Sequence, residues 1–203
     1  MVPRWPVVLA SASPRRKELL AQVFSEFEVL PADFAEEDFP ITDPRLQAEF
    51  LALEKAKVVA QSRPESLVIG SDTVVAVDIG NDSPSQLAKP CDERDATRML
   101  WLLSGKTHLV ITGVALVSPG GTIVASDTTS VTFRALIAEE IGEYVATGEP
   151  MDKAGAYAIQ GGAAAFVRAV EGSITNVIGL PMELLSRLLL ENGLADLDPS
   201  HGG

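Results

Sequence analysis

The hydrophobic pattern at the start of the chain changes from a continuous apolar run to helical spacing. Residues 7–10 read Val-Val-Leu-Ala, a run typical of a short buried strand. After a polar turn, Ser13 is a suitable N-cap and Pro14 stands at the first helical position. Leu19 and Val23 then fall on one apolar face. This part of the chain is therefore expected to form a strand, a turn and a helix.

Four further segments combine helical spacing of apolar residues with typical helix boundaries. Prolines just inside the first turn and glycines just past the last turn mark such boundaries. The predicted helices run from Thr42 or Asp43 to about Ala60, from about Asp92 through Leu103, from Glu139 to Ala146 before Gly148, and from Pro181 to Leu190 before Gly193.

Apolar runs between these helices predict strands at 67–70, 74–77, 109–117, 122–125, 128–133, 156–159 and 166–170. The polar triplet 71–73 separates the first two runs, and the turn at 118–121 predicts a hairpin between the third and fourth. Helices mixed with sequential and hairpin strands indicate an α/β fold with a mixed sheet. The 203 residues favour one domain over 1–198, with 199–203 as a frayed tail.

Composition and charge narrow the classes of protein. The formal net charge of −12 disfavours binding to a nucleic acid polymer, because such a surface repels a polyanion. No apolar run reaches the roughly 18 residues of a membrane span, and the first residues do not resemble a secretion signal. The lone Cys91 excludes an internal disulfide and fits a reducing compartment. We therefore expect a soluble, cytoplasmic protein without a membrane partner.

The segment Ser11-Ala-Ser-Pro-Arg-Arg16 is the strongest local candidate for a binding site. A helix N-terminus that follows a strand offers backbone N–H groups and the positive end of the helix dipole. The hydroxyl of Ser11 and the guanidinium groups of Arg15 and Arg16 add donors that suit a phosphate. The competing interpretation is a capped surface helix with solvated arginines.

Asp72 lies within the apolar stretch 67–77, where an ionised carboxylate is costly unless it is paired, bound to a metal or at the exposed end of a strand. A structural Asp bonded to backbone amides is one alternative. Another is the aspartyl nucleophile of haloacid-dehalogenase-type phosphatases, which need a second Asp two residues later. Val74 occupies that position, so the second alternative lacks its general acid.

Other polar residues are weaker candidates when taken one at a time. Lys55, Lys57 and Lys89 could each bind phosphate, although exposed lysines are normally solvated. Gln160 follows a segment of small residues and has an amide that could bind a base edge. Zinc spacing, a Walker motif and a nucleophile elbow do not occur. Carboxylates acting with phosphates indicate Mg²⁺ or Mn²⁺ as the metal.

Seven segments together resemble the Maf family of nucleoside triphosphate pyrophosphatases, in the order in which that family has them. They are Leu9-Ala-Ser-Ala-Ser-Pro-Arg-Arg16, Glu54-Lys-Ala56, Gly70-Ser-Asp-Thr-Val74, Leu87-Ala-Lys-Pro90, Leu103-Ser-Gly105, Asp152-Lys-Ala-Gly-Ala-Tyr-Ala-Ile-Gln-Gly161 and Val177-Ile-Gly-Leu-Pro181. The resemblance implies a Maf/Ham1-like α/β fold with two lobes around a cleft, and often a homodimer in the cytoplasm. It also implies metal-dependent hydrolysis of a nucleoside triphosphate to the monophosphate and pyrophosphate.

The resemblance also implies roles for individual residues. The phosphate-binding positions match Ser11, Arg15, Arg16, Lys55 and Lys89, and the proton acceptor matches Asp72, which would also help to hold the metal. A metal-site Glu matches either Glu36 or Glu37, which the spacing does not distinguish.

Three positions separate substrate groups within the family, and here they are Arg15, Thr73 and Gln160. These residues resemble the branch that hydrolyses dTTP and UTP, whereas the 7-methyl-GTP branch has Trp, Gln and Glu. The expected role is the removal of surplus or modified nucleotides. The alternative is a nucleotide-binding regulator of septum formation with vestigial turnover, which the retention of Asp72 disfavours.

Overall fold

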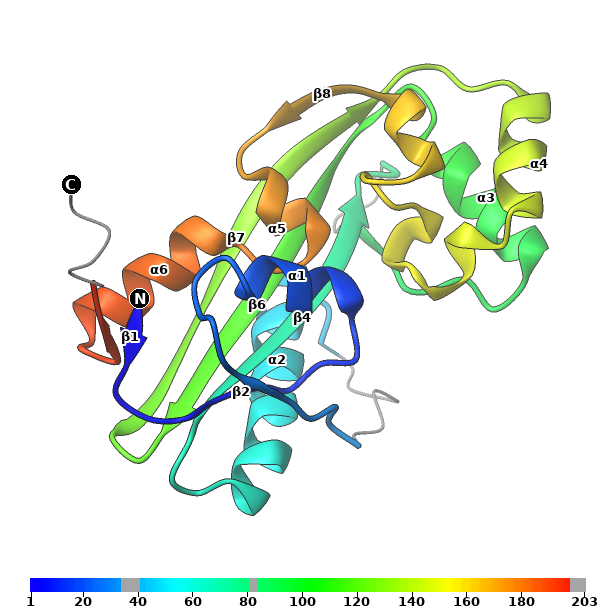
Figure 1. Ribbon diagram of the computed structural model, residues 1–203. Helices are drawn as coiled ribbons and strands as arrows, with labels where there is room; N and C mark the ends of the chain where they lie inside the picture. The colour runs from blue at the N-terminus through cyan, green and yellow to red at the C-terminus, as the bar shows by residue number, and fades with distance from the viewer. Residues whose placement is uncertain (34–40, 81–83, 198–203) are drawn as a thin grey trace.

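The computed structural model describes residues 1–33, 41–80 and 84–197 (Figure 1). The α-helices are α1 (Pro14–Leu20), α2 (Pro44–Ser62), α3 (Glu93–Leu103), α4 (Ala138–Ala146), α5 (Ile174–Ile178) and α6 (Met182–Glu191), and the 3₁₀ turns are η1 (Glu149–Asp152), η2 (Ala154–Ala156) and η3 (Gly162–Phe166). The strands are β1 (Val2–Pro3), β2 (Val7–Leu9), β3 (Glu28–Val29), β4 (Leu67–Val77), β5 (Ser85–Leu87), β6 (Thr107–Ser118), β7 (Gly121–Phe133), β8 (Val167–Glu171) and β9 (Ala195–Asp196).

A large mixed sheet organises this part of the chain. Its strands lie in the order β3-β2-β4-β6-β7-β8, with β5 also paired to β4, while β1 and β9 form a separate small ladder. β2 runs parallel to β3 and β4, and the remaining pairs in the large sheet are antiparallel. The predicted α/β fold with a mixed sheet is confirmed.

Strand β4 corrects the expectation of two short strands separated by the triplet 71–73. It is continuous from Leu67 to Val77 and pairs with β6 from Val68 to Ala76. The polar side chains are tolerated in mid-strand because each has a partner from another element. Ser71 Oγ donates to the carbonyl of Gly179, and the partners of Asp72 and Thr73 are described below. Similarly, β7 is one strand from Gly121 to Phe133 rather than two.

The predicted strand at 156–159 is also wrong. Residues 154–156 form the turn η2, in which Gly155 has φ 70° and Ala156 has φ 60°. This left-handed backbone cannot belong to a strand. The amide of Gly155 instead donates to the carbonyl of Ala88, which ties this turn to the end of β5.

The two faces of β4 carry different neighbours because side chains alternate along a strand. Val68 packs with α2 on one face, whereas Leu67 and Ile69 pack with α1 and α6 on the other. Gly70 and Gly113 lie on the α2 face, where a Cβ on either would come within 2.2 Å of a helix carbonyl oxygen. The two glycines therefore let α2 lie unusually close to the sheet.

The face of the sheet opposite α2 carries two apolar clusters, one at each end of the long strands. One contains Leu9, Leu20 and Leu185, from β2, α1 and α6. The other is formed by α3, α4 and the far ends of β6 and β7, around Phe133. Figure 1 shows α3 and α4 at one end of the molecule and the N-terminus, β1 and α6 at the other. Among the helices of the described residues, none has the length and apolar character needed to cross a membrane.

Candidate active site

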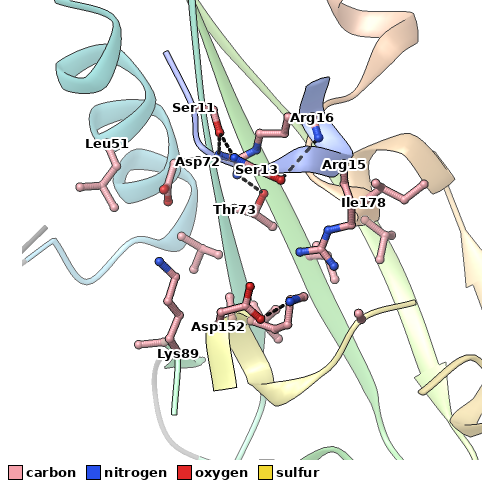
Figure 2. A pocket seen from close by; sticks show the side chains of 18 of the residues that line it. Ser11, Ser13, Arg15, Arg16, Leu51, Asp72, Thr73, Lys89, Asp152 and Ile178 are labelled. Atoms are coloured by element: carbon pink, nitrogen blue, oxygen red, sulfur yellow. Dashed lines mark hydrogen bonds and ion pairs between the residues drawn. The ribbon is translucent and has the colours of Figure 1, made fainter. Parts of the chain in front are cut away.

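A cleft of about 620 Å³ lies between the two apolar clusters, at a gap along one edge of β4 (Figure 2). β2 pairs with residues 67–69 of β4 and β5 pairs with residues 75–77 on the same edge. No described strand pairs with residues 70–74 on this side. Side chains from both faces of β4 therefore reach one opening, which explains how Asp72 and Thr73 line the same cleft.

Asp72 is directed to the α2 face, and its carboxylate is paired with a lysine there. Lys55 Nζ on α2 donates to Asp72 Oδ1 at 2.6 Å, and both side chains are largely buried. The close approach of α2, which Gly70 and Gly113 permit, brings this lysine to the middle of the sheet. Lys55 thus fixes the orientation of the Asp72 carboxylate at the wall of the cleft.

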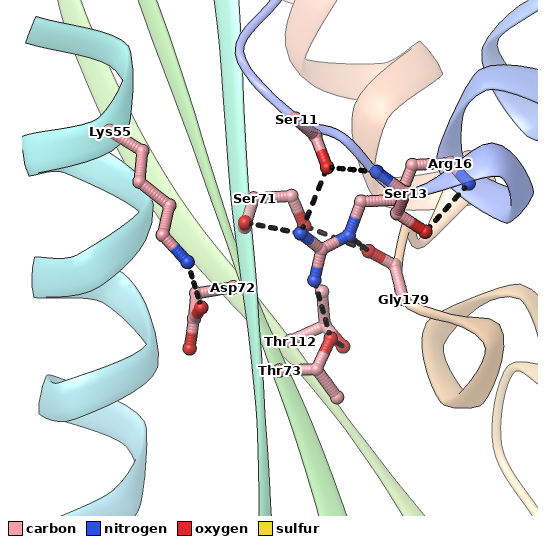
Figure 3. A network of polar contacts seen from close by, with 9 residues as sticks. All are labelled: Ser11, Ser13, Arg16, Lys55, Ser71, Asp72, Thr73, Thr112 and Gly179. Carbon is pink, nitrogen blue, oxygen red and sulfur yellow. Dashed lines mark hydrogen bonds and ion pairs between the residues drawn. The ribbon is translucent and has the colours of Figure 1, made fainter. Parts of the chain in front are cut away.

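Ser71 and Thr73 are directed to the opposite face, where the guanidinium of Arg16 joins three segments (Figure 3). Arg16 Nη1 donates to the Ser71 carbonyl at 2.8 Å and to Ser11 Oγ at 3.4 Å. Arg16 Nη2 donates to Thr73 Oγ1 at 3.2 Å, and Nε donates to the Gly179 carbonyl at 2.8 Å. Arg16 therefore connects β4 to the turn before α1 and to the end of α5.

The N-terminus of α1 forms another part of the cleft. The side chain of Ser13 accepts from the amide of Arg16, so the predicted cap is confirmed. Ser11 is buried, and its hydroxyl accepts from the amide of Ser13 at 3.2 Å. The neighbouring Arg15 extends into the cleft towards Asp152 (Figure 2).

Residues 148–162, which we call the loop wall, close the other side of the cleft. Asp152, Lys153 and Gln160 line it, together with Lys89 from the end of β5. Lys153 forms an ion pair with Asp152, and this hydrogen bond lowers the pKa of the Asp152 carboxyl, with a smaller contribution from the charge of Arg15. Positive and negative side chains thus face one another across the opening.

Tyr157 links the loop wall to a buried histidine. Its hydroxyl lies 2.8 Å from His108 Nε2, and both rings pack edge to face with Phe133. Burial lowers the pKa of His108 to about 4, and within the described residues nothing hydrogen-bonds its Nδ1. His108 is therefore neutral at pH 7, and it holds Tyr157 in place through this hydrogen bond.

The structure brings together every site residue that the resemblance implies and that it describes, whereas the weaker candidate Lys57 lies outside the cleft and pairs with Glu54. The residues that line this one cleft are Ser11, Arg15, Arg16, Lys55, Asp72, Thr73, Lys89 and Gln160. Glu36 and Glu37 lie outside the described residues. Sequence reasoning missed Ser71 and Gly179 as partners of Arg16, although both stand in the segments that carry the family resemblance.

Comparison with known proteins identifies the family to which the chain belongs. The model of the family described as Maf-like protein matches residues 6–192. A relative from Koribacter versatilis is 46% identical over 93% of this chain and 95% of its own, and one from Syntrophotalea carbinolica is 50% identical over 90% and 84%. One from Thermococcus gammatolerans is 47% identical over 90% and 94%, and all three are named dTTP/UTP pyrophosphatase.

A solved structure, that of the Staphylococcus aureus Ham1 protein, has the same fold. It aligns with a TM-score of 0.56 and 16% identity, over 92% of this chain and 99% of its own. By fold and site, the molecule is thus a Ham1-like α/β protein with a cation-lined cleft for a small molecule. The family match over nearly the whole length makes the assignment narrower: the chain belongs to the Maf family.

Proposed function

We propose that this protein is a nucleoside triphosphate pyrophosphatase that hydrolyses dTTP and UTP to the monophosphate and pyrophosphate. The observation that carries the proposal is the Asp72 carboxylate, held by Lys55 and facing a cleft that cations from separate segments line. The names of the relatives support this choice of substrates. Removal of surplus or modified nucleotides is the corresponding cellular role.

In this proposal the triphosphate lies along the positive side chains of the cleft. Arg15, Lys55 and Lys89 neutralise its charge, and the hydroxyl of Ser11 adds a donor beside the N-terminus of α1. Arg16 adds positive charge at the same wall while its hydrogen bonds keep Ser11 and Thr73 in place. Positioning and charge neutralisation are the main requirements of phosphoryl chemistry.

The donor set suits Mg²⁺ or Mn²⁺, which are held through one or two carboxylates plus the phosphate oxygens of a substrate. Asp72 offers such a carboxylate in the cleft, and in the described residues no cluster of three acidic, His or Cys side chains forms a complete metal cage. Glu36 or Glu37 is the second carboxylate in the proposal. When bound, the metal would neutralise the developing charge on the phosphates.

Asp72 acts as the proton acceptor in the proposed reaction. A water molecule attacks the α-phosphorus and gives up a proton to the Asp72 carboxylate as the new P–O bond forms. The bond from the α-phosphorus to the bridging oxygen breaks, and pyrophosphate leaves with the electron pair. Lys55 keeps the carboxylate oriented through its bond to Oδ1.

Gln160 is the residue that we expect to select the base. Its amide offers one donor and one acceptor, which complement the O4 and N3–H edge of uracil and thymine. Arg15 and Thr73 shape the same cleft from the opposite wall. Purine edges also offer a donor and an acceptor, but on a larger ring, so rejection of a purine depends on where the Gln160 amide is held relative to the base.

Pyrophosphate release with Mg²⁺, measured over a panel of dTTP, UTP, dATP, dGTP and 7-methyl-GTP, tests the proposal. We expect kcat/KM for dTTP and UTP to exceed that for the purines by at least about 10²-fold. Equal values across the panel, or the highest value for 7-methyl-GTP, would contradict the choice of substrate. Nucleotide binding without pyrophosphate release would instead support the regulatory alternative.

A homodimer in the cytoplasm belongs to the same proposal and rests on the family resemblance. Light scattering on the purified protein tests the dimer, for which a mass near twice the 21.5 kDa of one chain is expected.

A further inference from the structure

Gln160 stands in a short segment, residues 157–162, which has no regular secondary structure before Gly162, the first residue of η3. The segment connects η2 to η3, and within it the amide of Gly161 donates to the carbonyl of Ala158. Gln160 itself is exposed in the cleft. The position of its amide therefore depends on what holds the backbone on either side.

Two side chains from outside the segment hold that backbone. The amide of Ala158 donates to the Tyr144 hydroxyl at 3.2 Å, and the amide of Gly162 donates to Glu149 Oε2 at 3.1 Å. These two amides lie two residues before and two residues after Gln160. Tyr144 is on α4 and Glu149 opens η1, so neither belongs to the segment that it holds.

Tyr144 and Glu149 are also bonded to each other. The Tyr144 hydroxyl donates to Glu149 Oε1 at 2.9 Å while it accepts from Ala158, so one hydroxyl uses both of its functions. The Tyr144 ring is buried and packs edge to face on Phe166. The carboxylate and the hydroxyl thus form one unit, anchored in the core of α4.

The glycines of the segment fit closely against this unit. A Cβ on Gly161 would lie 1.9 Å from Glu149 Oε1, and a Cβ on Gly162 would lie 3.0 Å from the Tyr144 ring. The backbone of Gly161 has a negative φ of −117°, so the contact with Glu149, and not the backbone conformation, is what requires a glycine there. A side chain at position 161 or 162 would therefore meet Glu149 or Tyr144.

We propose that Tyr144 and Glu149 are positioning residues that set base selectivity by holding the backbone on both sides of Gln160. The inference rests on the proposed function, since it concerns how that same site distinguishes a pyrimidine from a purine. Neither residue lines the cleft, so each acts through Gln160 and not by touching the nucleotide.

Tyr144→Phe is the sharpest test, because it removes only the hydroxyl and keeps the buried ring. We expect the ratio of kcat/KM for UTP to kcat/KM for GTP to fall about three- to tenfold, through a higher KM for UTP with kcat little changed. Glu149→Gln should change the ratio in the same direction. Glu143→Gln is the matched control, because Glu143 is an exposed residue of α4 next to Tyr144. This variant should leave the ratio unchanged.

A double-mutant cycle shows whether Tyr144 acts through Gln160. In a Gln160→Ala background, Tyr144→Phe should alter the UTP to GTP ratio by less than about twofold, because the side chain that it positions is gone. An equal effect in both backgrounds would overturn the proposal. So would a Tyr144→Phe variant that folds and keeps the wild-type ratio.

Gly161→Ala provides a second route if Tyr144→Phe does not fold, since its methyl group would displace the Glu149 carboxylate while α4 stays intact. It should lower the ratio as Glu149→Gln does, and an unchanged ratio would overturn the proposal. Hydrogen–deuterium exchange of residues 157–165 separates this inference from the proposed function. Faster exchange in Tyr144→Phe and Gly161→Ala would show that Tyr144 and Glu149 hold this backbone, even if the wild type released no pyrophosphate. Unchanged exchange would refute the proposal.

Discussion

The two walls of the cleft are built in different ways. On the inner wall, formed by β4, α2 and the start of α1, the functional side chains bond to one another, and all but Ser11 stand on regular elements. Lys55 bonds to Asp72, and Arg16 bonds to Ser11 and Thr73. On the loop wall, Gln160 stands on an irregular segment whose backbone is held by Tyr144 and Glu149. On the inner wall, contacts between side chains hold the functional groups directly. On the loop wall, the contacts hold the backbone that carries Gln160.

This difference separates the two tasks of the proposed enzyme. Chemistry at the α-phosphorus requires a carboxylate and cations in fixed positions, which strands and helices provide more accurately than loops. Base selection requires a side chain that can be exchanged without disturbing the sheet. Substitutions of Asp72, Lys55 or Arg16 on the inner wall should therefore change the rate for every nucleotide, and substitutions on the loop wall should change the order of preference among nucleotides.

The largest effect is expected from Asp72→Asn, which keeps the size of the side chain but removes the proton acceptor. We predict a loss of at least about 10²-fold in kcat for UTP and dTTP alike, with the UTP to GTP ratio unchanged. Steady-state kinetics measure both quantities, and a melting curve checks that the fold survives. Near-normal turnover would show that Asp72 is not the proton acceptor. Asp196→Asn, at the exposed residue of β9, serves as the control.

Removal of single cations should have the next largest effect. Replacing Arg16, Lys55 or Lys89 by Ala should cost about 1.5–3 kcal/mol per charge-assisted bond, or about 10- to 100-fold in kcat/KM. Arg16 and Lys55 should lie at the upper end, because they also hold the inner wall, and the exposed Lys89 at the lower end. If all three variants keep wild-type kinetics, the phosphate chain binds elsewhere.

Gln160→Glu tests the loop wall by a smaller change. A carboxylate cannot donate to O4 of uracil but can accept from both N1–H and N2–H2 of guanine, so the preference for dTTP and UTP over dGTP should fall about tenfold while the melting temperature stays the same. The ratio of kcat/KM values over the nucleotide panel measures the change. A uniform loss for all nucleotides would place Gln160 with the inner wall and break the proposed division of tasks.

The smallest expected effect is on the free energy of unfolding at acidic pH, through His108, which bonds to Tyr157 of the loop wall. The pKa of His108 is about 4 in the folded protein and about 6.5 when exposed, so the unfolded chain binds the proton more readily between these values. His108 should therefore lower the free energy of unfolding by about 1 kcal/mol between pH 7 and pH 5.5. Denaturant unfolding at both pH values measures this, and the difference should shrink by that amount in His108→Phe.

The parts of the fold that local rules govern were predictable from the sequence. Ser13, Asp43 and Asp92 each accept a hydrogen bond from a backbone amide two or three residues later, as caps at the predicted helix starts. Helix α5 was missed because its five residues are too few to show a helical period. Local pattern thus predicted the longer helices and their boundaries, whereas the long strands β4 and β7 were each predicted as two.

The parts that depend on distant contacts were not predictable. The triplet 71–73 reads as a break in a strand, because its partners Lys55 and Arg16 are supplied by other elements. Arg16 bonds to Gly179, which lies 163 positions away. The resemblance grouped the residues that line the cleft, but it gave no sign that Arg16 is held by backbone carbonyls or that Tyr144 stands behind Gln160.

The close seat of α2 on the sheet restricts how this protein could be made more heat-resistant. Exchanging glycine for alanine usually stabilises a chain by about 0.4–1 kcal/mol where the native backbone accepts a side chain. At Gly70 and Gly113 the new methyl group would meet a helix carbonyl at 2.2 Å, and no rotamer change can relieve a clash with backbone. Gly142, on α4 with open space around it, accepts the same exchange freely. An engineer should therefore leave the sheet glycines alone and begin at Gly142.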